Sequence, residues 1–219
     1  MLSHLDRIIF PDRCEVITVA PHRYVYPIFK NGWTSLHTYS KKNKCRILIN
    51  EQIKKIDCID VILRDPQQRF RSGINTFIQW TLRDHPTLDA NTVSWFAQNY
   101  LFLNRHYAPQ FLWLINIARY MNPATELNFL SMDGIDDMTN IHRKPEVSPI
   151  TEQLADQLLN VSNNEMYDRI DQTLMTCIGR RMRFDQLVNY IEQQDPIAYK
   201  QVIDRSQRIL NPTYVLSKT

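Results

Sequence analysis

Two short segments of the chain combine cations, hydroxyls and a glycine in an order that suits anion binding. They are residues 26–35 (YPIFKNGWTS) and residues 64–73 (RDPQQRFRSG). Each follows an apolar, β-prone run and opens a stretch with helical periodicity. Unpaired backbone N–H groups and the helix dipole both favour negative charge at such a strand-to-helix junction. We therefore expect two anion sites on adjacent strands, suited to a ligand with two separated anionic groups.

In the first segment, Lys30 supplies a mobile charge and Thr34 and Ser35 supply hydroxyl donors. Between them, Asn31 and Gly32 can make a tight bend that turns several amides toward one phosphate. The G-x-x-x-x-G-K-[ST] pattern of nucleoside triphosphatases is absent. Taken alone, the segment is equally compatible with a solvated turn that carries a surface lysine.

In the second segment, Arg64 ends a strand and Ser72 lies two turns into the helix that follows, so both can face one anion. Asp65 and Pro66 are typical of the N-cap and first helical positions. We expect Arg69 to pair with Asp65 or with a backbone carbonyl, which is a structural role. Alone, this pattern also fits an ion-paired helix start.

Together, in this order, the two segments resemble the sulfotransferases that use 3′-phosphoadenosine 5′-phosphosulfate (PAPS). Their P-K-x-x-x-T-S/T loop is similar to P-I-F-K-N-G-W-T-S, and their R-x-P-x-x-R-x-x-S motif matches Arg64, Pro66, Arg69 and Ser72. The resemblance is strongest to Golgi-type carbohydrate sulfotransferases of the uronyl 2-O and chondroitin groups. Residues 104–110 (NRHYAPQ) are similar to their H-x-x-P-Q segment, and residues 195–202 (DPIAYKQV) to their closing D-x-x-x-Y-x-x-V helix.

This resemblance implies that the chain transfers a sulfuryl group from PAPS to an acceptor hydroxyl on a carbohydrate, without a metal. Lys30 would stabilise the bridging oxygen, and residues 31–35, Trp33 among them, would hold the non-bridging oxygens. Arg64 and Ser72 would hold the 3′-phosphate. Trp33 could also stack on adenine, line the acceptor cleft or belong to the core.

The general base that takes the acceptor's proton is a His or Glu in this family. The candidates are Glu51, which follows a strand, His106, which lies in the family-like segment, and His37, on the helix opened by Thr34; His85 is a further candidate later in the chain. Three features depart from the family pattern: Ile28 and Phe29 separate the proline from Lys30, the stretch between Lys30 and Arg64 is short, and we see no N-terminal membrane anchor. Against the Golgi-type family, the third departure leads us to expect a bacterial or viral version of the enzyme.

Two other functions fit the same residues. One is a nucleotide or small-molecule kinase with a degenerate phosphate loop. The other is a non-catalytic module that binds a nucleotide or glycan and has lost the base.

The pattern of the whole chain predicts an α/β fold: a P-loop-like parallel sheet flanked by helices, with a mostly helical C-terminal third, in a single domain over residues 1–219. The expected strands are residues 14–20, 23–28, 45–50, 59–64 and 126–132. The expected helices are residues 34–39, 67–82, 92–103 and 109–120, followed by helical periodicity from residue 150 with breaks near Gly179 and Asp195.

Composition limits the partners. The 219 residues carry a formal charge of +3, which argues against nucleic-acid binding held mainly by phosphate contacts. The four cysteines have no metal-site or disulfide-framework spacing, which indicates reduced thiols. With no apolar run long enough to span a bilayer and no signal-peptide core, we expect a cytoplasmic, membrane-free protein.

Overall fold

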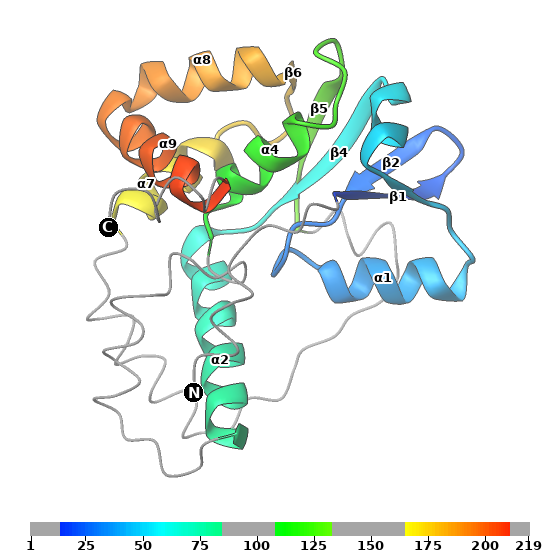
Figure 1. Ribbon diagram of the computed structural model, residues 1–219, viewed down its shortest axis with the longest axis horizontal. Helices are drawn as coiled ribbons and strands as arrows, with labels where there is room; N and C mark the ends of the chain where they lie inside the picture. The colour runs from blue at the N-terminus through cyan, green and yellow to red at the C-terminus, as the bar shows by residue number, and fades with distance from the viewer. Residues whose placement is uncertain (1–13, 85–107, 133–164, 211–219) are drawn as a thin grey trace.

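The computed structural model describes residues 14–84, 108–132 and 165–210 (Figure 1). Strands and helices alternate through the first two of these ranges, and helices dominate the third. The strands are β1 (Glu15–Ala20), β2 (Arg23–Tyr26), β3 (Ile47–Ile49), β4 (Cys58–Leu63), β5 (Glu126–Ser131) and β6 (Arg181–Arg183). The helices are α1 (Trp33–Lys42), the 3-10 helix η1 (Asn50–Lys55), α2 (Pro66–Asp84), α4 (Gln110–Ala118), α7 (Glu165–Met175), α8 (Phe184–Gln194) and α9 (Pro196–Leu210).

The strands of the described residues form one six-stranded sheet in the order β3-β1-β2-β4-β5-β6. The central strands β2, β4 and β5 are parallel, whereas β1, β3 and β6 pair antiparallel with their neighbours. The expected α/β class with flanking helices is confirmed. The expectation of a parallel sheet is wrong, because the sheet is mixed and only its centre is parallel.

The antiparallel β1–β2 pair has a local cause. Only Pro21 and His22 separate the two strands, and His22 has a left-handed φ of 57°. A two-residue connection with positive φ makes a hairpin, which requires antiparallel pairing. The register sets Ile17 opposite Val25.

The outermost strand beside β5 is β6, and it interrupts the helical pattern expected from residue 150 onward. This strand has three residues, two of them arginines, so it is too short and too charged for its sequence to show the alternation of a strand. Gly179, with a φ of 81°, turns the chain back so that Arg181 pairs with Asn128 of β5. The breaks expected near Gly179 and Asp195 are present.

Alternate residues of the strands face two separate apolar layers. On one face, Val16, Val61 and Phe129 join the main core with α4, α7, α8 and α9. On the other face, Ile17, Val25 and Ile62 pack around Leu36 of α1. Figure 1 shows the corresponding arrangement, with α1 on one side of the strands and α4 and the C-terminal helices on the other.

The helix starts next to the two segments follow from the sequence. α2 begins at Pro66, and Asp65 Oδ1 accepts a hydrogen bond of 2.9 Å from the Gln68 amide, as expected of an N-cap. α1 and α4 lie where helices were expected, although α1 runs three residues further, to Lys42. Residues 92–103 lie outside the described part of the chain.

We predict that the main core depends on Phe129, whose side chain is fully buried in β5. Phe129→Ala should lower the free energy of unfolding by about 3–5 kcal/mol, because it removes buried surface and leaves a cavity. Ile197→Ala, at an apolar residue that is 67% exposed, is the control and should change it by less than about 0.5 kcal/mol. Urea denaturation measures both, and equal effects would contradict the assignment of the core.

Candidate anion-binding site

The two segments emerge side by side from the sheet. β2 and β4 are parallel neighbours, with Tyr26 in register with Val61, so both strands end at the same edge. α1 and α2 begin beside each other below that edge (Figure 1). The carboxyl ends of neighbouring parallel strands are where open α/β sheets bind ligands. The expectation that the two junctions lie on adjacent strands is confirmed.

Two arginines of the second segment hold the backbone of the first. Arg64 Nη1 donates a hydrogen bond of 3.0 Å to the Lys30 carbonyl. Arg69 Nε donates one of 3.2 Å to the Phe29 carbonyl, in agreement with the structural role expected of Arg69. These two hydrogen bonds fix the position of the first loop relative to the second.

The first loop has an unusual backbone. Lys30 has a φ of 68° and Gly32 a φ of 79°, both left-handed. A non-glycine residue in this region costs about 1 kcal/mol, so contacts around it must hold it there. Gly32 makes the bend that was expected of it and is the N-cap of α1. The Asn31 amide closes a turn on the Ile28 carbonyl at 3.1 Å, so it does not face outward as expected.

The N-terminus of α1 is open. Gly32 provides no side-chain cap, and the first turn has no acidic residue. Within the described residues, no acceptor bonds the backbone N–H groups of Trp33, Thr34 or Ser35. Ser35 is half-buried and Thr34 exposed. Unpaired amides beside a left-handed cap are the donors that an anion would use.

Positive charge gathers around these amides. Lys30 is partly buried and its Nζ donates a hydrogen bond to Thr76 Oγ1 of α2. Burial, followed by repulsion from Arg64 and Arg69, lowers the pKa of Lys30 to about 8. Burial also lowers the pKa of Arg64. The site therefore holds cations at an electrostatic cost that a bound anion would relieve. Ser72, partly buried on α2, lies one turn before Thr76.

Polar groups beneath the loops are almost completely buried. Asn31 Nδ2 donates to the Ile62 carbonyl at 2.8 Å and to Gln110 Oε1 at 2.5 Å. Burial lowers the pKa of Arg69 to about 10, although the charge of Asp171 opposes this shift. Arg69 Nη2 and Asn31 Oδ1 are buried and have no hydrogen-bond partner among the described residues.

The structure separates the candidates for the base. His37 Nε2 lies 2.7 Å from Glu15 Oε1, and the His37 side chain is 15% exposed. Glu51 lies in η1 beyond the edge strand β3, where it forms an exposed ion pair with Lys54. His85 and His106 lie outside the described residues. Of these groups, His37 is the one shown beside the α1 end of the site.

Trp33 belongs to a row of aromatic rings. Its ring stacks on Phe29 with centroids 4.9 Å apart, and Phe29 lies 5.2 Å from Trp113 in the core. The ring of His37 lies 4.0 Å from that of Trp33. Trp33 thus connects the first loop to His37.

The sequence did not identify three residues that build this site. Thr76 accepts from Lys30, Gln110 bonds both loops, and Asp171 bonds Gln110. Thr76 lies one turn after Ser72, a spacing that places both on one helix face. Gln110 belongs to the quoted 104–110 segment, whereas nothing in the sequence indicated Asp171.

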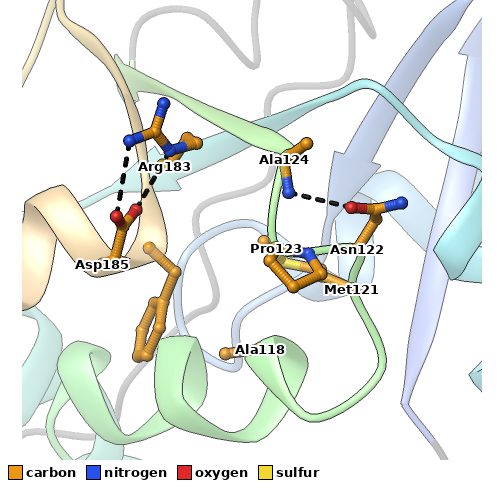
Figure 2. Close-up of a pocket in the computed structure, with 8 residues that line it drawn as sticks. Ala118, Met121, Asn122, Pro123, Ala124, Arg183 and Asp185 are labelled. Atoms are coloured by element: carbon orange, nitrogen blue, oxygen red, sulfur yellow. Dashed lines mark hydrogen bonds and ion pairs between the residues drawn. The ribbon is translucent and has the colours of Figure 1, made fainter.

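A separate cavity of about 560 Å³ lies at the opposite edge of the sheet, where β5 begins and β6 ends (Figure 2). Its polar groups bond one another: Arg183 pairs with Asp185 at 3.2 Å, and the Ala124 amide donates to Asn122 Oδ1 at 2.9 Å. Its lining also includes Ala118, Met121, Pro123 and Phe184. This cavity lacks the excess positive charge found around Lys30.

Searches of family models, curated proteins and solved structures give no match for this chain. Within the described residues, no helix is long and apolar enough to cross a membrane, and no three His, Cys, Asp or Glu side chains are grouped as a metal site requires.

We predict that Arg69→Met lowers the free energy of unfolding by about 3 kcal/mol at pH 7, because it leaves Asp171 buried without its cation. Burial raises the pKa of Asp171, and Arg69 opposes that rise. In the variant this folded-state pKa should rise further, so stability is lost as pH increases from the unfolded value toward the folded value. The deficit relative to the native chain should therefore be smallest near pH 4, where only the lost hydrogen bond to the Phe29 carbonyl remains, and grow toward neutral pH.

Thermal unfolding of both chains between pH 4 and pH 8 measures this difference. Arg71→Met, at an exposed arginine on the same helix, is the matched control and should give a nearly constant offset. A pH-independent deficit in Arg69→Met would show that Asp171 does not respond to Arg69.

Proposed function

We propose that the chain is a PAPS-dependent sulfotransferase that moves a sulfuryl group to an acceptor hydroxyl, with a carbohydrate as the acceptor class. The observation that carries this proposal is the joining of the Lys30 loop and Arg64 at one sheet edge by the Arg64–Lys30 hydrogen bond. Two adjacent cationic loops, one at an open helix N-terminus, suit a nucleotide with anionic groups at both its 3′ and 5′ positions.

The contacts suggest how the nucleotide is divided between the loops. The amides of residues 33–35, which have no acceptor among the described residues, would hold the 5′-phosphosulfate together with Lys30, as a P-loop-like turn does. Arg64 and Ser72 would hold the 3′-phosphate from the start of α2. On this arrangement the carbonyl contact of Arg64 also fixes the position of its guanidinium relative to Lys30.

In direct sulfuryl transfer the protein forms no covalent bond to the sulfuryl group, and its main task is to stabilise the negative charge on the leaving oxygen. The acceptor oxygen attacks sulfur as the bond from sulfur to the bridging oxygen breaks, and that oxygen leaves with the 5′-phosphate of 3′,5′-adenosine bisphosphate (PAP). Lys30 would stabilise the negative charge that develops on this oxygen. Lys30 is held by Thr76 in this structure, so it would exchange one hydroxyl partner for the phosphosulfate.

The proton of the acceptor hydroxyl must pass to a base. We assign this role to His37, because its ring contacts Trp33 at the start of α1 and its other neighbour is the carboxylate of Glu15. Glu51 is less suited, since its carboxylate pairs with Lys54 in solvent. His106 remains a candidate that the described residues do not test.

We predict that PAP binding follows the charge of Lys30. A bound anion raises the pKa of Lys30 above its free value of about 8, so binding near pH 8 should take up as much as about half a proton. Affinity should be nearly constant below about pH 7, begin to fall near pH 8 and be several-fold weaker by about pH 9.5, as free Lys30 loses its charge. Calorimetry in buffers of different ionisation enthalpy measures both quantities, and Lys30→Ala, the control, should show neither effect.

Thermal-shift measurements on the native chain distinguish the sulfotransferase from the two rival functions. Thermal stabilisation by PAP, and none by ATP with magnesium, is the expected result. Stabilisation by ATP with magnesium alone would favour the kinase, and PAP binding without transfer to any acceptor would favour the binding module.

We predict that three substitutions divide binding from rate. Arg64→Ala should weaken PAP binding by about tenfold or more, because it removes a charge-assisted phosphate contact. Lys30→Ala and His37→Ala should lower kcat by about a hundredfold or more while PAP affinity stays within several-fold. Labelled sulfate transfer from PAPS to a glycan panel gives the rate, and calorimetry gives the affinity. Equal losses of affinity and rate in Lys30→Ala would contradict the role assigned to it.

A further inference from the structure

One completely buried side chain bonds both loops of the site. Gln110 is the first residue of α4 and has no exposed surface. Its Oε1 accepts from the Arg64 amide at 2.9 Å and from Asn31 Nδ2 at 2.5 Å. Its Nε2 donates to the Arg64 carbonyl at 2.9 Å. A single amide group therefore joins the end of β4 to the loop that follows β2.

Asp171, on α7, anchors Gln110 from the other side. Its Oδ2 accepts from the Gln110 backbone amide at 2.9 Å and lies 3.4 Å from Gln110 Nε2. Its Oδ1 accepts from the Phe111 amide at 3.2 Å. A carboxylate at a helix N-terminus accepts hydrogen bonds from the first amides and is attracted to the positive end of the helix dipole. The start of α4 is thereby fixed against α7, and the Gln110 side chain is fixed with it.

We infer that Gln110, held by Asp171, is a positioning residue that sets the separation of the two anion-binding loops. It touches no ligand and acts through Arg64 and Asn31. The consequence for a nucleotide rests on the proposed function, because the ligand must contact both loops at once. α4 and α7 thus belong to the site, although neither carries a group assigned to the chemistry.

The chemistry of the position restricts what can replace glutamine. The side chain must accept two hydrogen bonds and at the same time donate one of 2.9 Å to the Arg64 carbonyl; it also donates a longer one of 3.4 Å to Asp171 Oδ2. An ionised glutamate cannot donate and would place a second carboxylate beside Asp171. A protonated glutamate has the same shape as glutamine and can donate through its one hydroxyl to the Arg64 carbonyl, so it gives up only the longer contact with Asp171. Gln110→Glu should therefore behave like the native chain only while its carboxyl is protonated.

The experiment measures PAP affinity of the native chain and of Gln110→Glu at pH 5.5 and pH 8. The matched control is Thr125→Val, which removes a buried 2.7 Å hydrogen bond to the Ile56 carbonyl at the opposite edge of the sheet. We expect the affinity of Gln110→Glu to lie within about twofold of the native value at pH 5.5 and to be about tenfold weaker at pH 8. The ratio for Thr125→Val should stay near one at both values.

A second measurement uses no ligand. Amide hydrogen exchange of residues 27–35 and 64–66 should be faster in Gln110→Glu than in the native chain at pH 8, and equal at pH 5.5. Gln110→Asn, which is one methylene shorter, should exchange faster and bind PAP more weakly at both pH values. This variant decides the matter if Gln110→Glu does not fold at pH 8.

The outcomes are distinct. Native affinity and native exchange at pH 8 in both folded Gln110→Glu and folded Gln110→Asn would overturn the positioning role, because a buried carboxyl beside Asp171 can stay protonated at pH 8. Failure of the native chain to bind PAP would overturn the proposed function, and the exchange measurements would still decide whether Gln110 holds the two loops together.

Discussion

The contacts of Arg64 and Arg69 with two successive carbonyls of the first loop are the interaction on which the rest of the site depends. Those hydrogen bonds hold Lys30 in a left-handed conformation. That conformation, followed by Gly32, leaves the first amides of α1 without acceptors among the described residues. A loop held through its carbonyls presents its amides to a ligand, which is how backbone anion sites are made. The parallel pairing of β2 and β4 brings the arginines within reach.

The same arrangement creates an electrostatic imbalance. Lys30, Arg64 and Arg69 are crowded into a partly dry region, and burial lowers the pKa of each. Asp171 offsets part of this charge from below, and it also fixes Gln110 under the two loops. Such clusters of shifted groups are typical of functional sites. The backbone of the site is therefore held by hydrogen bonds, while its cations repel one another. An anionic ligand would reduce this repulsion.

Local patterns predicted much of this architecture. The α/β class, the Asp65 cap, the bend at Gly32 and the adjacency of the two segments follow from hydrophobic periodicity and turn chemistry. The mixed sheet was not foreseen, although the two-residue Pro21–His22 connection indicates a hairpin, and β6 was too short to leave a pattern. Gln110 and Asp171 depend on contacts between residues 61 positions apart, which a single sequence does not reveal. The roles assigned to Lys30 and Arg64 stay predictions.

The most direct test is to titrate the isotope-labelled chain with PAP and to monitor the binding through the amide chemical shifts in solution. The central claim is that the loops after β2 and β4 hold the two ends of one ligand. It predicts that the largest shifts appear together in residues 30–35 and 64–72 with a single affinity. Shifts confined to one of these segments, or centred on Met121 and Phe184 at the far edge of the sheet, would contradict it.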